Sequence, residues 1–393
     1  MKRAVTILPT IVIAQFFCTS IWFAGNGVMS ELIVDFKLNP NALGHLTSFV
    51  QFGFILGTLT FAIFTIADRF SPSKVFFSCA LLASLFNLGV VWDGNTLSSI
   101  LVFRLATGFF LAGIYPVGMK IASDHFKKGL GKSLGFLVGA LVLGTAFPHL
   151  ARELTATFPW KAVLFLTSGL AVFGGVLMFI LVPNGPHRKP SSRLDLTAFF
   201  SVFHNHKFRS AAFGYFGHMW ELYAFWAFVP VILNTYGELN YNLKLNISLW
   251  SFTIIAIGGL ACVCSGYLAQ KFGTKRIAFL SLLLSCLCCL LSPLLFKSSS
   301  ESFFIGFLMF WGMVVIADSP LFSTLVAQNA PAEIKGTALT IVNCIGFSIT
   351  IMSIQLLNGL RIMGNPTFIY IVLALGPIFG LIALVIEKKR QSG

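Results

Sequence analysis

Long apolar stretches alternate with short polar segments along the whole chain. A helix needs about 20 mostly apolar residues to cross a hydrocarbon core of roughly 30 Å. By this criterion the sequence predicts about twelve membrane-spanning helices. They lie near residues 5–30, 43–67, 75–93, 97–122, 132–152, 161–183, 209–235, 247–269, 277–296, 302–327, 337–360 and 367–386. The pattern indicates an all-α membrane protein.

The widest polar connection divides the predicted helices into two groups of six. It begins with Asn184, Gly185 and Pro186 and continues with further proline, serine and basic residues, a composition typical of linkers. We therefore predict a first half over residues 1–183, a linker over 184–207 and a second half over 208–393.

A short basic turn recurs at the same place in each half, after the second and the eighth span. The two copies are 202 residues apart. Internal repeats of this kind are typical of secondary transporters. The first copy contains Asp68, Arg69 and Lys74, and the second contains Gln270, Lys271 and Arg276.

Composition and charge agree with a membrane protein. Of 393 residues, 56% are hydrophobic and 10% are charged, whereas soluble domains carry about 25% charged residues. The net charge of +14 falls entirely on the loops that share a side with the two termini. Cytoplasmic loops carry the excess of Lys and Arg, so we expect both termini in the cytoplasm and no nucleic-acid partner.

The first apolar run is too long for a secretory signal, and we interpret it as the first span.

Three sets of residues on spans two, four and five form transporter signatures. They are Gly44, Gln51, Gly53, Gly57, Asp68, Arg69 and Lys74; Arg104 to Gly108; and Gly135, Gly139, Gly144 and Pro148. In these motifs the sequence resembles the major facilitator superfamily of transporters over its full length, although Phe64 and Gln270 depart from the family pattern.

The resemblance implies two six-helix halves that alternate access to a cavity lined by spans one, four, seven and ten. It also implies that the basic turns, with Asp68, Arg69, Lys74, Lys271 and Arg276, latch one conformation, with Asp68 near the start of span eleven around Lys335–Thr337.

A few ionisable residues fall inside the predicted spans, where a charge costs at least a few kcal/mol. Arg104 and Lys120 lie on span four, Glu221 on span seven and Asp318 on span ten. Tyr115 shares a polar stripe with Arg104. These residues are candidates for substrate binding or proton coupling, although Lys120 is close enough to water to snorkel.

Span seven carries the densest candidate chemistry. His218 and Glu221 are three residues apart and share a helix face. Burial disfavours an ionised carboxylate, and His titrates near physiological pH, so both are candidate proton carriers; a structural hydrogen bond is the alternative. Asp318 precedes Ser319 and Pro320, and a proline weakens a helix. Further candidate polar or aromatic groups of the cavity are Asn26, Gln51, Trp220, Tyr223 and Asn343.

The sequence therefore predicts a proton-coupled secondary transporter of a small polar or organic solute, with an anion as one alternative. A multidrug or metabolite efflux antiporter is the second interpretation, and a transporter-like receptor is a third. The chain lacks a phosphate-binding loop and an H-E-x-x-H motif, so we expect no enzyme activity, no cofactor and no metal. We expect a monomer in the lipid bilayer of a bacterial inner membrane, with a small-molecule substrate and protons as partners.

Overall fold

The computed structural model describes residues 2–39, 41–126, 130–188, 202–240, 244–298, 300–331 and 335–391. These residues form helices and connecting turns without any strand, as the sequence predicts. The chain divides into two compact units, Met1–Arg193 and Leu194–Gly393. Residues 189–201 of the predicted linker lie outside the described residues.

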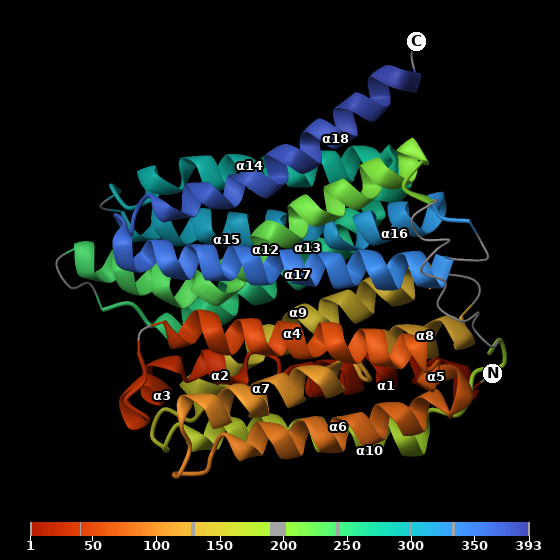
Figure 1. Cartoon of the computed structure of the whole chain (residues 1–393), viewed down its shortest axis with the longest axis horizontal. Helices are drawn as coiled ribbons and strands as arrows, with labels where there is room; N and C mark the ends of the chain where they lie inside the picture. Colours follow the sequence, from red (N-terminus) through yellow and green to blue (C-terminus); the bar gives the residue numbers. More distant parts are fainter. Residues whose placement is uncertain are drawn as a thin grey trace. The chain divides into compact units, whose positions relative to one another are not determined.

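Unit 1 contains the first six predicted spans, some of them broken into consecutive helices (Figure 1). Its helices are α1 (Lys2–Thr19), α2 (Ala24–Gly27), α3 (Met29–Asp35), α4 (Ala42–Ile63), α5 (Ile66–Arg69), α6 (Pro72–Gly89), α7 (Leu97–Leu111), α8 (Tyr115–His125), α9 (Leu130–Leu154) and α10 (Lys161–Leu181).

Unit 2 contains the last six predicted spans, arranged around α12 (Figure 1). Its helices are α12 (His206–Leu239), α13 (Ile247–Phe272), α14 (Thr274–Leu295), α15 (Glu301–Ala317), α16 (Ser319–Asn329), α17 (Lys335–Met363), the 3-10 helix η2 (Ile369–Ala374) and α18 (Leu375–Gln391).

Eleven segments of the described chain are long and apolar enough to cross a membrane. The predicted first span differs, because it consists of α1, a break at residues 20–23 and the short helices α2 and α3. Spans four and ten are also divided, each by a short break between two helices. Proline stands in the first turn of the second helix in both cases, at Pro116 and Pro320, where a missing N–H costs nothing.

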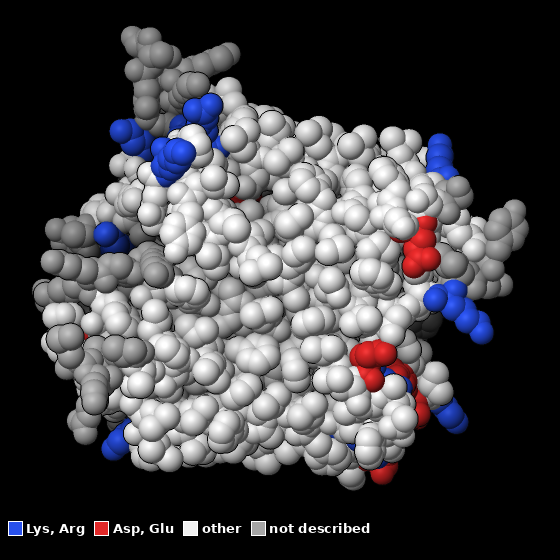
Figure 2. Space-filling model, turned by 180° about the vertical axis from the view of Figure 1, so that it is seen from behind, with Lys and Arg blue, Asp and Glu red and all other residues white. Residues whose placement is uncertain are grey.

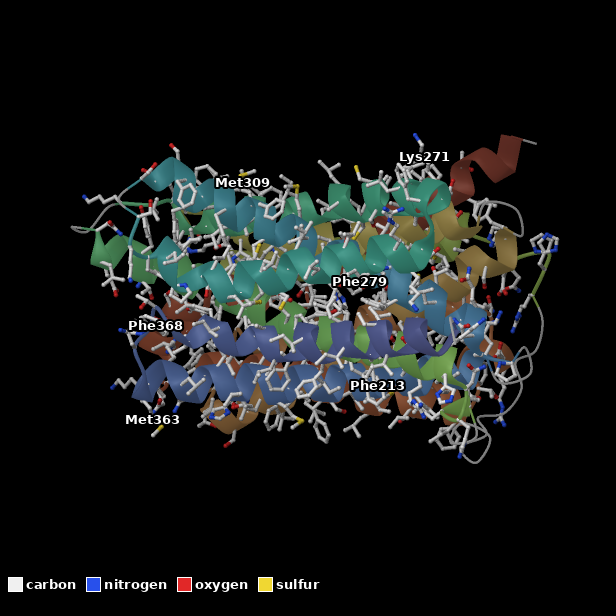
Figure 3. All side chains as sticks on the ribbon, turned by 90° about the horizontal axis from the view of Figure 1, so that it is seen from above. Phe213, Lys271, Phe279, Met309, Met363 and Phe368 are labelled. Atoms are coloured by element: carbon white, nitrogen blue, oxygen red, sulfur yellow. The ribbon has the colours of Figure 1, made fainter. Side chains whose placement is uncertain are left out.

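The outer surface of the helices is apolar, as expected for a surface that lipid solvates. On the face drawn in Figure 2, most Lys, Arg, Asp and Glu side chains gather at the two ends of the helices. Apolar side chains of unit 2 project outward along its helices (Figure 3). Phe213, Phe368 and Met363 are 44%, 50% and 89% exposed. Exposed apolar side chains along eleven described segments of sufficient length are those of a multi-pass membrane protein.

Glycines let helices approach at backbone distance inside each unit. A Cβ atom on Gly53 of α4 would lie 1.9 Å from the carbonyl oxygen of Leu105 on α7, and one on Gly108 would lie 2.0 Å from that of Val50. In unit 2, a Cβ atom on Gly312 of α15 would lie 2.1 Å from the carbonyl oxygen of Ile254 on α13. Small residues serve this purpose in membrane helices, so spans two and four pack closely in unit 1, and spans eight and ten in unit 2.

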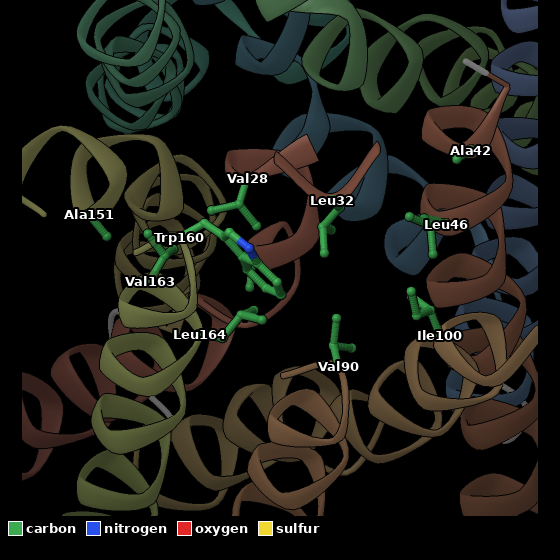
Figure 4. Close-up of a cluster of buried hydrophobic side chains, with 11 residues drawn as sticks. Val28, Leu32, Ala42, Leu46, Val90, Ile100, Ala151, Trp160, Val163 and Leu164 are labelled. Carbon is green, nitrogen blue, oxygen red and sulfur yellow. The ribbon is translucent and has the colours of Figure 1, made fainter. Parts of the chain in front are cut away.

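One end of unit 1 is held by a hydrophobic cluster under the broken first span (Figure 4). Trp160 lies at its centre, and its indole Nε1 donates to Asp35 Oδ2 of α3. Burial of large apolar side chains there fixes the short helices α2 and α3 against α10. The cluster consists of Ala24, Val28, Leu32, Ala42, Leu46, Val90, Ile100, Ala151, Trp160, Val163 and Leu164.

Candidate functional site

The break in span ten places a carboxyl group inside unit 2. Helix α15 ends at Ala317, and the carbonyl oxygen of Asp318 accepts from the backbone N–H groups of Leu321 and Phe322 as α16 begins. The side chain of Asp318 caps neither helix and is 1% exposed. A buried carboxyl without a capping role requires another partner.

That partner is His218 of α12. Its Nδ1 lies 2.7 Å from Oδ1 of Asp318, and both side chains are 1% exposed. The imidazole ring also lies beside the rings of Tyr215 and Phe322, with centroids 6.1 and 6.4 Å away. The fold thus brings together two titratable residues that are 100 positions apart in the sequence.

Glu221 lies one turn further along α12 and is equally buried. Its Oε1 accepts from Ser285 Oγ at 2.5 Å and Cys289 Sγ at 3.2 Å, both on α14. The same oxygen accepts from Trp311 Nε1 of α15 at 2.6 Å. Three donors on one oxygen stabilise the ionised carboxylate, while burial opposes it. We call Glu221, Ser285, Cys289 and Trp311 the Glu221 cage.

The other predicted residues of α12 and α17 face different neighbours. The hydroxyl of Tyr215 donates to Asn343 Oδ1 on α17 at 2.7 Å, so Asn343 links two helices. Trp220 donates to the carbonyl oxygen of Val372 in η2 at 3.1 Å. Tyr223 is buried and packs against Trp226 and Phe347. Trp220 therefore lies on a different face from the Glu221 cage.

Arg104, on α7 of unit 1, is 1% exposed. Its Nη1 donates to the carbonyl oxygen of Ile21 at 3.2 Å and to Asn87 Oδ1 at 3.1 Å, and its Nη2 donates to the carbonyl oxygen of Trp22. Within the described residues, no carboxylate lies at ion-pair distance from this guanidinium. The guanidinium is therefore held by main-chain and amide oxygens.

Lys120 lies in the middle of α8 and contacts the basic turn of unit 1. Its Nζ lies 2.9 Å from Asp68 Oδ1 and 3.6 Å from Asp124 Oδ1. Arg188 donates to the carbonyl oxygens of Asp68 and Phe70. The structure thus groups Lys120 with Asp68 rather than with Arg104.

The remaining predicted residues of the turns lie at helix ends, and all four are exposed: Arg69 on α5, Lys74 on α6, Lys271 on α13 and Arg276 on α14. Two further candidates are buried: Asn26, whose Nδ2 donates to Thr47 Oγ1 at 2.9 Å, and Gln51 on α4. Tyr115 is half-buried as the first residue of α8.

Sequence reasoning missed the residues that hold the candidate charges. Ser285, Cys289 and Trp311 read as ordinary apolar or small positions of spans nine and ten, and Asn87 as a polar residue in span three. No local pattern marks such donors, because their role depends on helix packing. Among the described residues, no group of three or more His, Cys, Asp and Glu side chains is arranged to hold a metal ion.

Comparisons with known proteins identify relatives of both the sequence and the fold. The sequence profile of the Major Facilitator Superfamily matches residues 11–354. The benzoate transport protein of Acinetobacter baylyi is 25% identical over 146 residues, which are 35% of this chain and 30% of that protein. The chain thus spans less than a third of the length of this relative.

Two solved structures resemble the fold at 13% sequence identity. One is a bacterial homologue of the human lysosomal transporter Spinster in an inward-facing and unoccupied conformation, with a TM-score of 0.67 over 98% of this chain and 95% of that chain. The other is a mutant of the nucleoside transporter NupG, with a TM-score of 0.70 over 98% and 99%. At this identity the likeness shows the fold alone.

Proposed function

Because the chain belongs to the Major Facilitator Superfamily, and is thus a membrane transporter, we propose that it couples the movement of a small organic solute to protons. The observation that carries this proposal is the buried contact between His218 and Asp318 inside unit 2. An ionisable residue inside a membrane protein is costly and is retained mainly where function requires it.

The His218–Asp318 pair is suited to binding and releasing one proton. With a neutral imidazole and an ionised carboxylate, the pair carries one negative charge in a region that excludes water. One added proton makes the pair neutral overall, whichever of the two side chains holds it. Because ionised groups are strongly disfavoured in such surroundings, proton binding changes the free energy of this site substantially.

The position of Asp318 connects proton binding with the shape of span ten. Its main chain forms the break between α15 and α16, so a change in its contact with His218 acts directly on that break. A proton shifts a conformational equilibrium only if it binds the two states unequally. A bend that makes or breaks the 2.7 Å contact provides such a difference.

Glu221 is a second buried acid in contact with span ten, through Trp311. Two of its donors, Ser285 and Cys289, lie on α14, and the third, Trp311, lies on α15. A protonated Glu221 is a weaker acceptor than the carboxylate, so its contacts with α14 and α15 weaken when it binds a proton. We propose that the two acids together set the bend of span ten during transport.

The solute is proposed to be a small organic acid. The matching segment of the benzoate transport protein supports this choice, and benzoate is therefore the first compound to test. We further propose that both termini are cytoplasmic, since all of the net charge falls on the loops of that side. The protein is also proposed to work as a monomer in a bacterial inner membrane.

The experiment begins with a thermal-shift screen of the purified protein against organic acids, amino acids, sugars, nucleosides and cationic drugs. The stabilising compound is then followed in proteoliposomes, as accumulation driven by a pH gradient and as counterflow without one. Asp318→Asn and Glu221→Gln should abolish accumulation and retain counterflow, because the amides keep the shape but cannot titrate. Asp93→Asn, which removes an acid that is 88% exposed, is the matched control and should retain both. Normal accumulation in both buried variants would refute the proposal.

A further inference from the structure

The imidazole ring of His218 has one nitrogen that contacts the protein and one that does not. Its Nδ1 lies 2.7 Å from Oδ1 of Asp318, whereas its Nε2 is buried and has no hydrogen-bond partner among the described residues. A buried polar atom without a partner is uncommon and requires an explanation. Because Nδ1 is already engaged, Nε2 is the atom of this side chain that can meet a ligand.

Asp318 decides whether Nε2 donates or accepts a hydrogen bond. An ionised carboxylate only accepts, so Nδ1, at 2.7 Å from it, carries the hydrogen. In the neutral imidazole, Nε2 then has a lone pair and no hydrogen. One added proton reverses this, because Nε2 carries a hydrogen both in an imidazolium beside a carboxylate and in an imidazole that accepts from a carboxylic acid. Proton binding therefore turns Nε2 from an acceptor into a donor.

His218 is also the one buried side chain described in unit 2 that can carry a positive charge. The other buried charged residues described in this unit are Glu221 and Asp318. No Lys or Arg of the described chain lies at ion-pair distance from either acid. In unit 1, Arg104 is already held by main-chain and amide oxygens. An anionic solute therefore finds its donor in unit 2 at His218, and only after a proton has bound.

The surroundings of His218 suit an aromatic ring. The rings of Tyr215 and Phe322 lie beside the imidazole, with centroids 6.1 and 6.4 Å away. Phe322 packs directly on α12, since a Cβ atom on Gly214 would lie 2.3 Å from its Cε1. Ligand sites typically combine apolar and aromatic side chains with a few placed polar groups. A flat ring that carries one carboxylate matches this combination.

Other titratable groups face the His218–Asp318 pair from the neighbouring helices. Tyr215 and Glu221 lie on α12 with His218, and Glu221 is held by its cage. From α13, Cys262 donates through Sγ to the carbonyl oxygen of Ile316 at 3.4 Å, two residues before Asp318. Thiols and phenols ordinarily titrate above about pH 8. Near neutral pH, a proton exchanged here therefore belongs to His218, Asp318 or Glu221.

We propose that His218 Nε2 binds the carboxylate of the solute, and that it does so only while the His218–Asp318 pair holds its proton. The inference rests on the proton-coupled transport proposed above, and adds the substrate class, an aromatic monocarboxylate, and the atom that binds it. Solute and proton each raise the affinity for the other by the same factor. Asp318→Asn retains counterflow on this account, because its amide N–H donates to Nδ1 and leaves the hydrogen on Nε2.

Binding of benzoate to the purified wild-type protein tests the inference without transport. Isothermal titration calorimetry is run from about pH 5.5 to about pH 8, a range in which benzoate stays ionised because carboxylic acids titrate near pH 4. The affinity should fall about tenfold per pH unit in the upper part of this range. Titrations in buffers of different ionisation enthalpy should show that one proton is taken up with each benzoate. Acetate, which has the carboxylate but no ring, should bind at least about tenfold more weakly.

Two variants of His218 place an amide at different ends of the imidazole. His218→Asn replaces Nδ1 and leaves nothing at Nε2, and should lower the affinity for benzoate at acid pH by about tenfold or more. His218→Gln places an amide N–H near Nε2, a donor that does not titrate, and should bind benzoate with an affinity that does not depend on pH. The matched control is His149→Asn, because His149 is 3% exposed on α9 of unit 1; it should bind benzoate as the wild type does.

Three results would overturn the inference. The first is wild-type binding of benzoate by His218→Asn, and the second is a pH dependence that persists in His218→Gln, since another group would then take up the proton. The third is a wild type that binds no benzoate at any pH, although proton-coupled transport of another solute would still support the proposed function. Benzoate binding with proton uptake, but without proton movement during transport, would contradict the proposed function alone.

Discussion

The hydroxyl of Ser285 donates to a buried carboxyl group, and its removal measures the charge of that group. Ser285→Ala deletes one oxygen atom and leaves Cys289 and Trp311 on Oε1 of Glu221. Ser292→Ala is the matched control, because Ser292 is equally buried on the same helix but donates to the main-chain carbonyl of Cys289. The two deleted hydrogen bonds therefore differ in their acceptor, which is a carboxyl group for Ser285 and a neutral carbonyl for Ser292.

The expected magnitudes follow from that difference. A hydrogen bond to an ionised group contributes about 1.5–3 kcal/mol to stability, and one between neutral groups about 0.5–1.5 kcal/mol. Ser285→Ala should therefore cost about 2 kcal/mol and Ser292→Ala about 1 kcal/mol. In the Glu221→Gln background the acceptor is neutral, and Ser285→Ala should then cost about 1 kcal/mol.

The assay is reversible unfolding of the purified protein in mixed micelles. Ser285→Ala, Glu221→Gln and their double variant form a thermodynamic cycle. Such a cycle isolates the energy of the Ser285–Glu221 contact. An energy near 1 kcal/mol agrees with an ionised Glu221 in the folded protein. Equal costs for Ser285→Ala and Ser292→Ala, together with an additive double variant, would show that Glu221 is neutral and would refute the reasoning about its cage.

Two further predictions concern unit 1. Gly53→Ala should destabilise the protein by about 1–3 kcal/mol or more, since its Cβ would lie 1.9 Å from a carbonyl oxygen of α7, whereas Gly135→Ala, with no atom within 4 Å, should be neutral or stabilising in the same unfolding assay. Asp68→Asn removes the 2.9 Å contact with Lys120, a partly exposed pair that contributes about 1 kcal/mol or less. This variant should change the turnover rate of transport with little change in solute affinity, and an unchanged rate would exclude Asp68 as a conformational latch.

The pattern of apolar runs was sufficient to predict the fold. Bilayer thickness sets the length of each span, so spans two to twelve of the prediction coincide with described apolar segments. The breaks were harder to predict. Pro320 marks the one in span ten, but no proline or glycine lies within residues 20–23 of span one. That break is stabilised by Arg104, which lies more than 80 residues further along the chain.

The candidate site was predictable only in its charged members. Glu221, His218 and Asp318 are conspicuous because an ionisable residue is costly in an apolar span, and the structure joins two of them directly. Lys120 was grouped with Arg104 because both are on span four, but a helix of this length separates them by several turns. Lys120, on the second helix of this span, instead contacts Asp68 of α5. Which side chains surround Glu221 depends on the packing of α12, α14 and α15, which no local pattern encodes.

The central claim is that transport moves protons through the His218–Asp318 pair. The most direct measurement is proton movement on addition of the solute identified by the thermal-shift screen, followed with a pH-sensitive dye trapped in proteoliposomes. The wild type should move protons in a fixed ratio to the solute, and Asp318→Asn should move solute in counterflow without protons. Full solute transport by the wild type with no proton movement would contradict the claim.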